Sequence, residues 1–199
     1  MSRTIRMKPH HFVDIVTALG QGQTTYTPHP YGHALHKVAA SILTAHDRFD
    51  LARASDLLTL ADDSGLEVDA LDGAPGVYTA RYAGPGASDE DRYRKLLATL
   101  GDIPPEQRTA RFRCAVALAH PGRRPTVAEG TCEGVIAYEP QGANGFGYDP
   151  VFYLPEFGCT MAQLHPEHKN RISHRARAMR AARPLLDQIL AEGGESQDA

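Results

Sequence analysis

The stretch LADDSGLEVDALDGAPGVYTARYAG, residues 60–84, joins an apolar run to two carboxylates and a glycine-rich loop. Residues 57–61 are continuously apolar and stop at Asp62 and Asp63, which predicts a short buried strand with both carboxylates at its end. Residues 73–86 are punctuated by glycine and proline, so we expect an ordered loop without regular structure there.

The segments after this loop alternate between helical and strand patterns. Ser88 and Asp91 form a capping box before an apolar helical face that ends at Gly101. A half-buried strand is predicted over residues 110–118, where Arg111 and Arg113 alternate with the apolar side chains of Ala110, Phe112, Cys114, Val116 and Leu118. Residues 126–138 can pair back against it. Helices interleaved with strands predict a mixed α/β domain.

Three features complete the expected elements of the C-terminal half. Gly130 and Gly134 lie inside the second strand and suggest β-bulges. A short strand is expected over residues 151–154. The last helix is predicted to begin at the N-cap Ser173 and to be kinked by Pro184.

We expect one domain over residues 1–192, followed by a disordered tail over 193–199. Before residue 57, the pattern predicts a short helix over 12–19 and a second one over 33–43. The first sixty residues have an unusual composition, because six of the ten histidines lie within the first 46 residues.

Composition excludes several classes of protein. The chain has 199 residues and a net charge of −3 without a block of like charges, which is unlike a protein that grips duplex nucleic acid. No apolar run is long enough to span a bilayer and no signal-peptide pattern is present, so we expect a soluble, cytoplasmic protein. Cys114, Cys132 and Cys159 are widely spaced and are interpreted as core thiols.

The first candidate site is Asp62-Asp63-Ser64-Gly65. Adjacent carboxylates raise each other's pKa unless a cation balances them, and Mg²⁺ is commonly bound by one or two carboxylates together with substrate phosphates. In open α/β sheets, ligands bind at the carboxyl ends of strands. The alternative is an ordinary solvated turn, because these residue types are common in turns.

The second candidate site is residues 142–150, GANGFGYDP. Glycines on both sides of Phe146 allow the backbone to approach a ligand and leave the ring free to stack on a nucleobase. Asp149 can accept hydrogen bonds from a base edge. The alternative is a structural turn with Phe146 and Tyr148 packed into the core.

The third candidate site is residues 169–175, KNRISHR, before and at the start of the last helix. Free N–H groups at a helix N-terminus, together with Lys169 and Arg175, favour an anionic or carbonyl-bearing ligand. The guanidinium of Arg175 can donate two hydrogen bonds to one carbonyl or phosphate. The alternative is a solvated basic turn.

Taken together, the three motifs resemble the inosine triphosphate pyrophosphatase family, also called the Ham1 family. Residues 60–84 resemble the family signature, and GFGYDPVF at 145–152 and KNRISHR at 169–175 match its other two motifs in order. The resemblance covers residues 60 to about 190. It implies an elongated central sheet with flanking helices, a nucleotide cleft between two lobes, and a homodimer.

The resemblance also implies an activity and a set of residues. The implied reaction is Mg²⁺-dependent hydrolysis of ITP, dITP and XTP to the monophosphate and pyrophosphate, which cleanses the nucleotide pool. Asp63 corresponds to the general base and a metal ligand, with Asp62 assisting at the metal. The implied substrate-binding residues are Ser64 at the substrate, Phe146 stacked on the purine, Gly147, Tyr148 and Asp149 lining the base and ribose pocket, and Lys169, His174 and Arg175 at the 6-oxo edge.

The first sixty residues depart from the family pattern. No asparagine precedes Asn144, so the family's Ser/Thr-x-Asn-x-x-Lys loop is missing, and HALHK at 33–37 stands where its Glu-Asn-Ala helix start is expected. One interpretation is a divergent enzyme with substitute ligands, which are Lys8, Arg48 or Arg53 for the triphosphate and His33 or Asp50 for the lost glutamate. The other is a misassigned or frameshifted N-terminus joined to a normal family body.

Two other functions stay open on the residues alone. The chain can be a catalytically impaired nucleotide-binding protein with a defective N-terminal region. Alternatively, His29, His33 and His36 can form a zinc-binding module, although Pro30 interrupts a helix through them.

Overall fold

The computed structural model describes residues 58–120 and 123–194. Its strands are β1 (Thr59–Val68), β2 (Pro75–Gly76), β3 (Thr109–Ala119), β4 (Thr126–Ile136), β5 (Phe152–Leu154) and β6 (Cys159–Thr160). Its α-helices are α4 (Asp89–Leu100), α5 (Pro166–Ile172) and α6 (His174–Gly194), and 3₁₀ turns lie at Asp69–Leu71, Thr79–Arg81, Pro105–Gln107 and Met161–Gln163.

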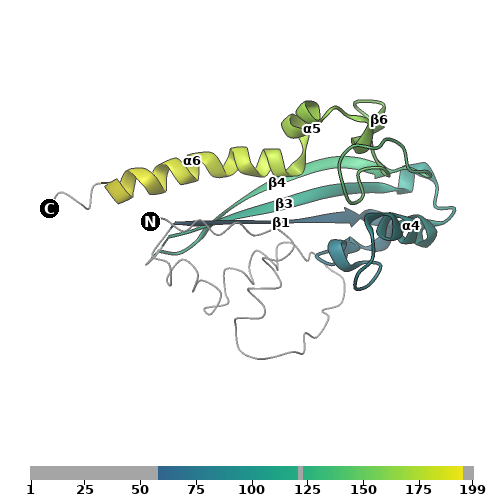
Figure 1. Ribbon diagram of the computed structural model, residues 1–199, viewed down its shortest axis with the longest axis horizontal. Coiled ribbons are helices and arrows are strands. Elements are labelled where there is room, and N and C mark those ends of the chain that lie inside the picture. Colours follow the sequence, from purple (N-terminus) through teal and green to yellow (C-terminus); the bar gives the residue numbers. More distant parts are fainter. Residues whose placement is uncertain (1–57, 121–122, 195–199) are drawn as a thin grey trace.

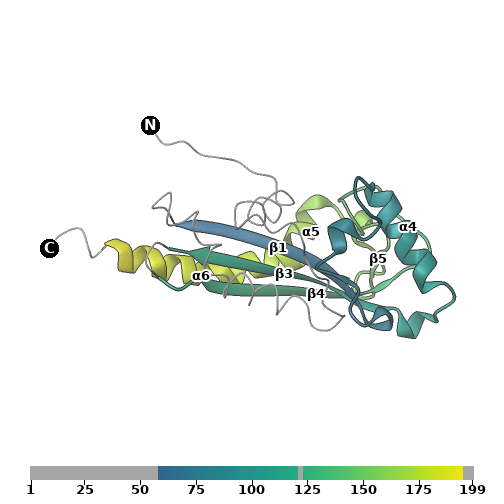
Figure 2. The same cartoon turned by 90° about the horizontal axis from the view of Figure 1, so that it is seen from below.

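The described strands form one antiparallel sheet in the order β2-β1-β3-β4-β5-β6. Its centre is made of the three long strands β1, β3 and β4, which run side by side (Figure 1). In Figure 2, the helix α6 lies along one face of these strands and α4 lies at their far end. The expected mixed α/β architecture with an elongated central sheet and flanking helices is confirmed.

The strand β1 is longer than the sequence predicts. It pairs with β3 from Thr59↔Ala119 to Val68↔Ala110. Asp62 and Asp63 therefore lie within the strand and not at its end, and the carboxyl-end argument for this site is wrong. The reason is that Leu66 and Val68 are fully buried, so core packing extends the strand through residues that alone have turn composition.

The predicted bulges in β4 are also wrong. The register between β3 and β4 runs without interruption from Thr109↔Val135 to Leu118↔Thr126. A Cβ at Gly130 would overlap the backbones of His174 and Ala178, and one at Gly134 would lie 2.7 Å from the ring of Phe152. Both glycines thus serve close packing, and Gly130 lets α6 approach the sheet.

The predicted helix signals are largely confirmed. The Ser88–Asp91 capping box starts α4, and Gly101 is its C-cap. The Ser173 hydroxyl accepts a 3.3 Å hydrogen bond from the backbone N–H of Ala176 at the start of α6. Pro184 lies inside α6, which continues through Gly194, so the first two residues of the expected tail are helical.

The core consists of two hydrophobic clusters. The larger one lies between α4 and the far end of the sheet and includes Leu66, Leu96 and Phe112. The smaller one lies between α6 and the sheet and consists of Cys114, Val116, Ala128, Ala178 and Ala182. His174, the first residue of α6, stacks on Phe112 of the larger cluster, and Ala178 one turn later belongs to the smaller one, so the two clusters meet at the start of α6.

The remaining expectations fall partly outside this structure. The helices expected over 12–19 and 33–43, the substitute ligands and the His29, His33 and His36 site lie outside the described residues. None of the helices in the described ranges is both long and apolar enough to cross a membrane.

Candidate active site

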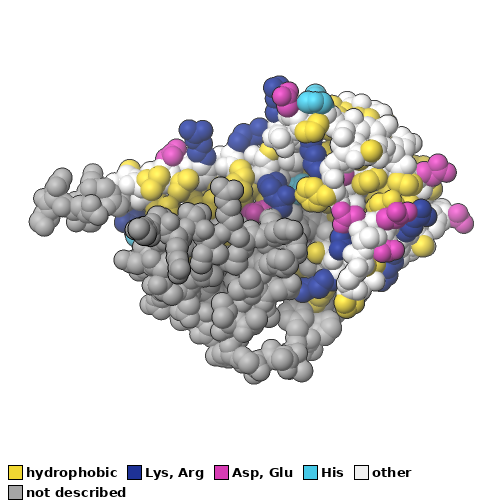
Figure 3. All heavy atoms as spheres, viewed as in Figure 1, with side chains coloured by type: hydrophobic (Ala, Val, Ile, Leu, Met, Phe, Trp, Pro, Cys, Tyr) yellow, Lys and Arg dark blue, Asp and Glu magenta, His cyan; other side chains and the backbone are white. Residues whose placement is uncertain are grey.

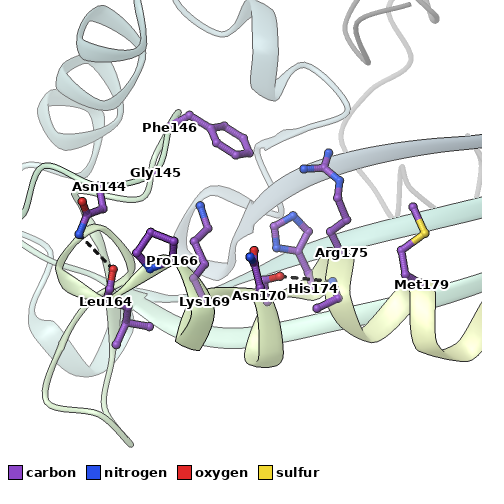
Figure 4. Close-up of a pocket in the computed structure, with 12 residues that line it drawn as sticks. Asn144, Gly145, Phe146, Leu164, Pro166, Lys169, Asn170, His174, Arg175 and Met179 are labelled. Atoms are coloured by element: carbon purple, nitrogen blue, oxygen red, sulfur yellow. Dashed lines mark hydrogen bonds between the residues drawn. The ribbon is translucent and has the colours of Figure 1, made fainter. Parts of the chain in front are cut away.

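A pocket of about 400 Å³ lies between the 142–150 loop, α5 and the first turns of α6. Of the predicted site residues, Phe146, Lys169, His174 and Arg175 line it. In Figure 4, these four side chains point to the same side of the two helices, with Phe146 nearest one end and Arg175 toward the other. The second and third sequence motifs are therefore brought together into one site.

Phe146 is available to a ligand. Its side chain is 60% exposed, and the Lys169 ammonium lies 4.5 Å from the centre of its ring. An exposed aromatic ring beside a cation is an energetically suitable platform for a flat, electron-rich heterocycle.

The loop that carries Phe146 is held in place by a buried carboxylate. Asp149 accepts a 2.7 Å hydrogen bond from the backbone N–H of Phe146 and forms an ion pair with Lys169. Burial raises the pKa of Asp149, and the charge of Lys169 opposes that rise. Asp149 therefore binds two residues that line the pocket, Phe146 and Lys169, and fixes their positions.

Gly147 and Tyr148 do not line the pocket. The backbone N–H of Gly147 donates a 2.7 Å hydrogen bond to Asp89 at the start of α4. Tyr148 is buried, and its hydroxyl donates a 2.9 Å hydrogen bond to the Thr79 carbonyl. The structure gives both residues contacts that hold the loop, as the core-packing alternative for Tyr148 predicted.

His174 is a buried, neutral imidazole at the floor of the pocket. It is 7% exposed, and burial together with the charges of Arg175 and Lys169 lowers its pKa to about 3. Its Nδ1 atom is buried and has no hydrogen-bond partner among the described residues. A buried polar atom without a partner is costly, and this one lies in a residue that lines the pocket.

Arg175 connects the pocket to β1. Its Nε donates a 2.6 Å hydrogen bond to Asp62 Oδ2, and its Nη2 lies 3.5 Å from the Ser64 hydroxyl. The first sequence motif is therefore joined to the other two through this guanidinium.

Asp63 is in a different electrostatic situation from its neighbour. Burial is the main cause of its raised pKa, and the charge of Asp62 adds to the rise. The backbone N–H of Ser64 donates a 2.9 Å hydrogen bond to it, and the charges of Arg175 and Arg81 lower the pKa. Asp63 is thus a carboxylate whose charge the protein balances incompletely.

The residues around Asp63 fit a divalent cation. A buried carboxylate with a raised pKa gains stability from a nearby positive ion. Within residues 58–120 and 123–194, no group of three or more His, Cys, Asp or Glu side chains could hold a metal by itself. A single buried carboxylate such as Asp63 suits an ion such as Mg²⁺, which keeps several water molecules as ligands and also binds the phosphates of its substrate.

Charge is distributed unevenly around the site. The first turn of α4 carries Asp89, Glu90 and Asp91, and Figure 3 shows acidic side chains gathered at that end of the molecule. The pocket is instead lined by the cations Lys169 and Arg175. It is therefore suited to a ligand that offers anionic or carbonyl oxygens.

Sequence reasoning missed several residues of the site. Asp89 accepts a hydrogen bond from the loop, and the charge of Arg81 lowers the pKa of Asp63; both effects join distant segments, so local patterns do not indicate them. The helix α5, which carries Lys169, was also missed. Its signal is Pro166 in the first turn, a position where proline favours a helix start.

Comparisons with known proteins agree with this geometry. A model of the Ham1 family matches residues 29–185, so the match begins well before residue 60, where the sequence motifs start. A dITP/XTP pyrophosphatase of Geobacillus kaustophilus is 56% identical over 138 residues, which are 69% of this chain and 68% of that protein. One of Listeria monocytogenes is 57% identical over 131 residues, 66% of this chain and 64% of that protein.

Solved structures show the same relationship. The Staphylococcus aureus Ham1 protein superposes with a TM-score of 0.70 at 39% identity, covering 87% of this chain and 85% of that one. A HAM1 protein from Coxiella burnetii gives a TM-score of 0.65 at 34% identity, covering 94% and 96%.

Proposed function

Because the chain belongs to the Ham1 family, we propose that it hydrolyses dITP, ITP and XTP to the monophosphate and pyrophosphate. The observation that carries this proposal is the pocket in which exposed Phe146, neutral His174 and Arg175 point the same way. The two relatives described above share more than half of their residues with this chain over the aligned segment, and both are named dITP/XTP pyrophosphatases.

The pocket explains the choice of base. Phe146 stacks on the purine, and Lys169, His174 and Arg175 surround its 6-position. A 6-oxo group accepts hydrogen bonds from the Lys169 ammonium and the Arg175 guanidinium, whereas the 6-amino group of adenine is itself a donor and leaves them without an acceptor. Unpaired buried donors are a strong source of discrimination, so adenine nucleotides are rejected.

Asp63 supplies the general base. Its carboxylate accepts a proton from the water that attacks the α-phosphate, and pyrophosphate leaves in line with that attack. The backbone N–H of Ser64 orients the carboxylate through its hydrogen bond to Oδ1. When bound beside Asp63, Mg²⁺ supplies charge neutralisation for the phosphates.

The remaining parts of the proposal rest on the resemblance. They are Mg²⁺ as the ion, a homodimer, a cytoplasmic location, and Ser64, Gly147, Tyr148 and Asp149 as substrate-binding residues. For Gly147, Tyr148 and Asp149, the contacts described above support a role in holding the loop around the ligand.

The test is pyrophosphate release from dITP, ITP, XTP, dATP and ATP with Mg²⁺, using the full chain and Asp63→Asn. We expect turnover of the 6-oxo substrates to exceed that of the adenine nucleotides and to fall at least ~100-fold in Asp63→Asn. Asp102→Asn, which changes an exposed carboxylate outside the pocket, is the matched control. Equal hydrolysis by Asp63→Asn contradicts the assignment, and binding of ITP without hydrolysis identifies the catalytically impaired alternative.

A further inference from the structure

The carboxylate of Asp62 contacts the arginine of the base pocket. From this contact we propose that Asp62 is a positioning residue that fixes Arg175 for recognition of the base and does not hold the metal. The inference rests on the proposed function of the pocket. It assigns to Asp62 a role different from the metal-assisting one that the family resemblance implies.

Strand geometry separates Asp62 from Asp63. Consecutive side chains of a strand point to opposite faces of the sheet. Asp62 lies opposite Val116, which packs with Ala178 of α6, whereas Asp63 lies opposite Ala115. Asp62 therefore faces α6, and Asp63 points to the other face.

The contact between Asp62 and Arg175 is suited to orienting a guanidinium. Nε is the donor closest to the aliphatic stem, and its 2.6 Å hydrogen bond to Asp62 restricts rotation of the planar group. The Asp62 side chain is 16% exposed and that of Arg175 is 34% exposed, so the pair is partly shielded from water.

The remaining donors of Arg175 are left for a ligand. Nη2 has one long contact of 3.5 Å to Ser64, and Nη1 has no hydrogen-bond partner among the described residues. Since Arg175 lines the pocket, its Nη1 and Nη2 groups are the donors that can bind a carbonyl of the ligand.

This arrangement couples selection of the base to the chemistry. Asp62 and Asp63 are consecutive residues of β1. Asp62 positions Arg175 at the base, and Asp63 supplies the carboxylate that acts at the α-phosphate. Because β1 pairs with β3 before and after these two residues in the chain, the distance between Asp62 and Asp63 is set by a rigid strand. A 6-oxo base seated against Arg175 is thereby placed at a fixed distance from Asp63.

The test measures binding of IMP and AMP to the full chain by calorimetry without a divalent metal. We expect the wild type to prefer IMP, and Asp62→Asn to reduce that preference about tenfold. Asp63→Asn is the matched control and retains the preference. In an Arg175→Gln background, Asp62→Asn adds nothing further, because a residue that acts through another is not additive with it.

A second measurement separates positioning from metal binding. The Mg²⁺ concentration for half-maximal pyrophosphate release should be unchanged in Asp62→Asn, whereas KM for dITP rises. Asp62→Glu keeps the charge but displaces the guanidinium, so it should also weaken the preference for IMP. Thermal unfolding confirms that each variant is folded.

Three outcomes overturn the inference. An unchanged IMP preference in both Asp62 variants removes the positioning role. A higher Mg²⁺ requirement with an unchanged preference identifies Asp62 as a metal ligand. Equal binding of IMP and AMP by the wild type shows instead that the proposed base pocket is wrong, and the inference fails with it.

Discussion

The imidazole of His174 is stacked on the ring of Phe112, with ring centroids 4.8 Å apart and planes inclined by 16°. Phe112 comes from β3 and also contacts Phe152, at a centroid distance of 4.6 Å. The pocket floor is thus continuous with the larger hydrophobic cluster. This apolar contact explains why burial lowers the pKa of His174 and keeps it neutral near pH 7.

The first prediction concerns acid stability. The pKa of His174 is about 3 in the folded chain and near 6.5 when unfolded, so the unfolded state binds more protons between these values. Stability therefore falls as the pH is lowered from 6.5 toward 3. We expect His174→Gln to show a smaller loss, measured by urea unfolding at several pH values.

The matched control for this prediction is His165→Gln, because His165 is exposed. That variant should lose stability on acidification as the wild type does. A His174→Gln profile parallel to the wild type contradicts a neutral, buried His174.

The fold could be predicted from sequence where local chemistry decides it. The Ser88–Asp91 capping box and the Ser173 N-cap are signals within one helical turn, and both are correct. The length of β1 is decided by its pairing with β3, which begins after residue 108. The turn-like composition of Asp62 and Asp63 therefore placed the end of β1 too early in the chain. Local patterns do not contain such long-range pairing.

The second prediction follows from Gly130. A methyl group there would overlap the backbones of His174 and Ala178, so Gly130→Ala must push α6 away from β4. We expect a loss of about 2 kcal/mol in unfolding free energy, because backbone cannot move aside as a flexible side chain can. Affinity for IMP should fall too, since α6 carries His174. Chemical denaturation and calorimetry measure the two effects.

Thr131→Ala is the control for Gly130→Ala, because Thr131 is the next residue of β4 and its side chain points to the opposite face of the sheet. It should change stability and affinity little. Normal IMP affinity in Gly130→Ala would show that the start of α6 does not depend on this close approach.

The third prediction concerns the effect of the Asp63 charge on the stability of the fold. Its raised pKa means that the folded state holds a proton more tightly than the unfolded state, so stability is lost as pH rises through the folded pKa. Without divalent metal, Asp63→Asn should unfold at an equal or higher temperature than the wild type at pH 7.5. This advantage should vanish at acidic pH.

Addition of Mg²⁺ is the complementary measurement. The ion should raise the melting temperature of the wild type and leave that of Asp63→Asn unchanged, because the variant lacks the carboxylate that binds it. An equal rise in both proteins contradicts Asp63 as the metal-binding residue.

The candidate site was predictable in its parts but not in its connections. The glycines around Phe146 and the cations at Lys169 and Arg175 are visible as motifs, and the structure brings them to one pocket. The hydrogen bond from Arg175 to Asp62 joins segments far apart in the chain. Adjacent acids suggest a shared cation, whereas a strand turns them to opposite faces.

The fourth prediction concerns the exposed ring of Phe146. Phe146→Ala should weaken IMP binding by about 1–3 kcal/mol, the contribution of stacking a base on an aromatic side chain. The melting temperature should change little, because the side chain is 60% exposed. Phe146→Tyr keeps the ring and should keep most of the affinity. If Phe146→Ala binds IMP normally, the ring is not the stacking platform.

The fifth prediction concerns Lys169, whose ammonium contacts both the Asp149 carboxylate and the Phe146 ring. Lys169→Met leaves Asp149, which is 3% exposed, buried without its counter-ion. Such a loss costs about 3 kcal/mol, and the carboxylate reduces the cost by taking up a proton. The pKa of Asp149, already raised by burial, must therefore rise further.

The sign of the pH dependence distinguishes this cause from a simple loss of packing. Protonation relieves the uncompensated charge, so the stability deficit of Lys169→Met should be largest at high pH and should shrink as pH falls. Urea unfolding at pH 5 and pH 8 measures it. Lys169→Met combined with Asp149→Asn removes both charges and should recover part of the deficit at pH 8. A deficit of equal size at both pH values, or no recovery in the double variant, would show that Lys169 stabilises the loop through contacts other than its charge.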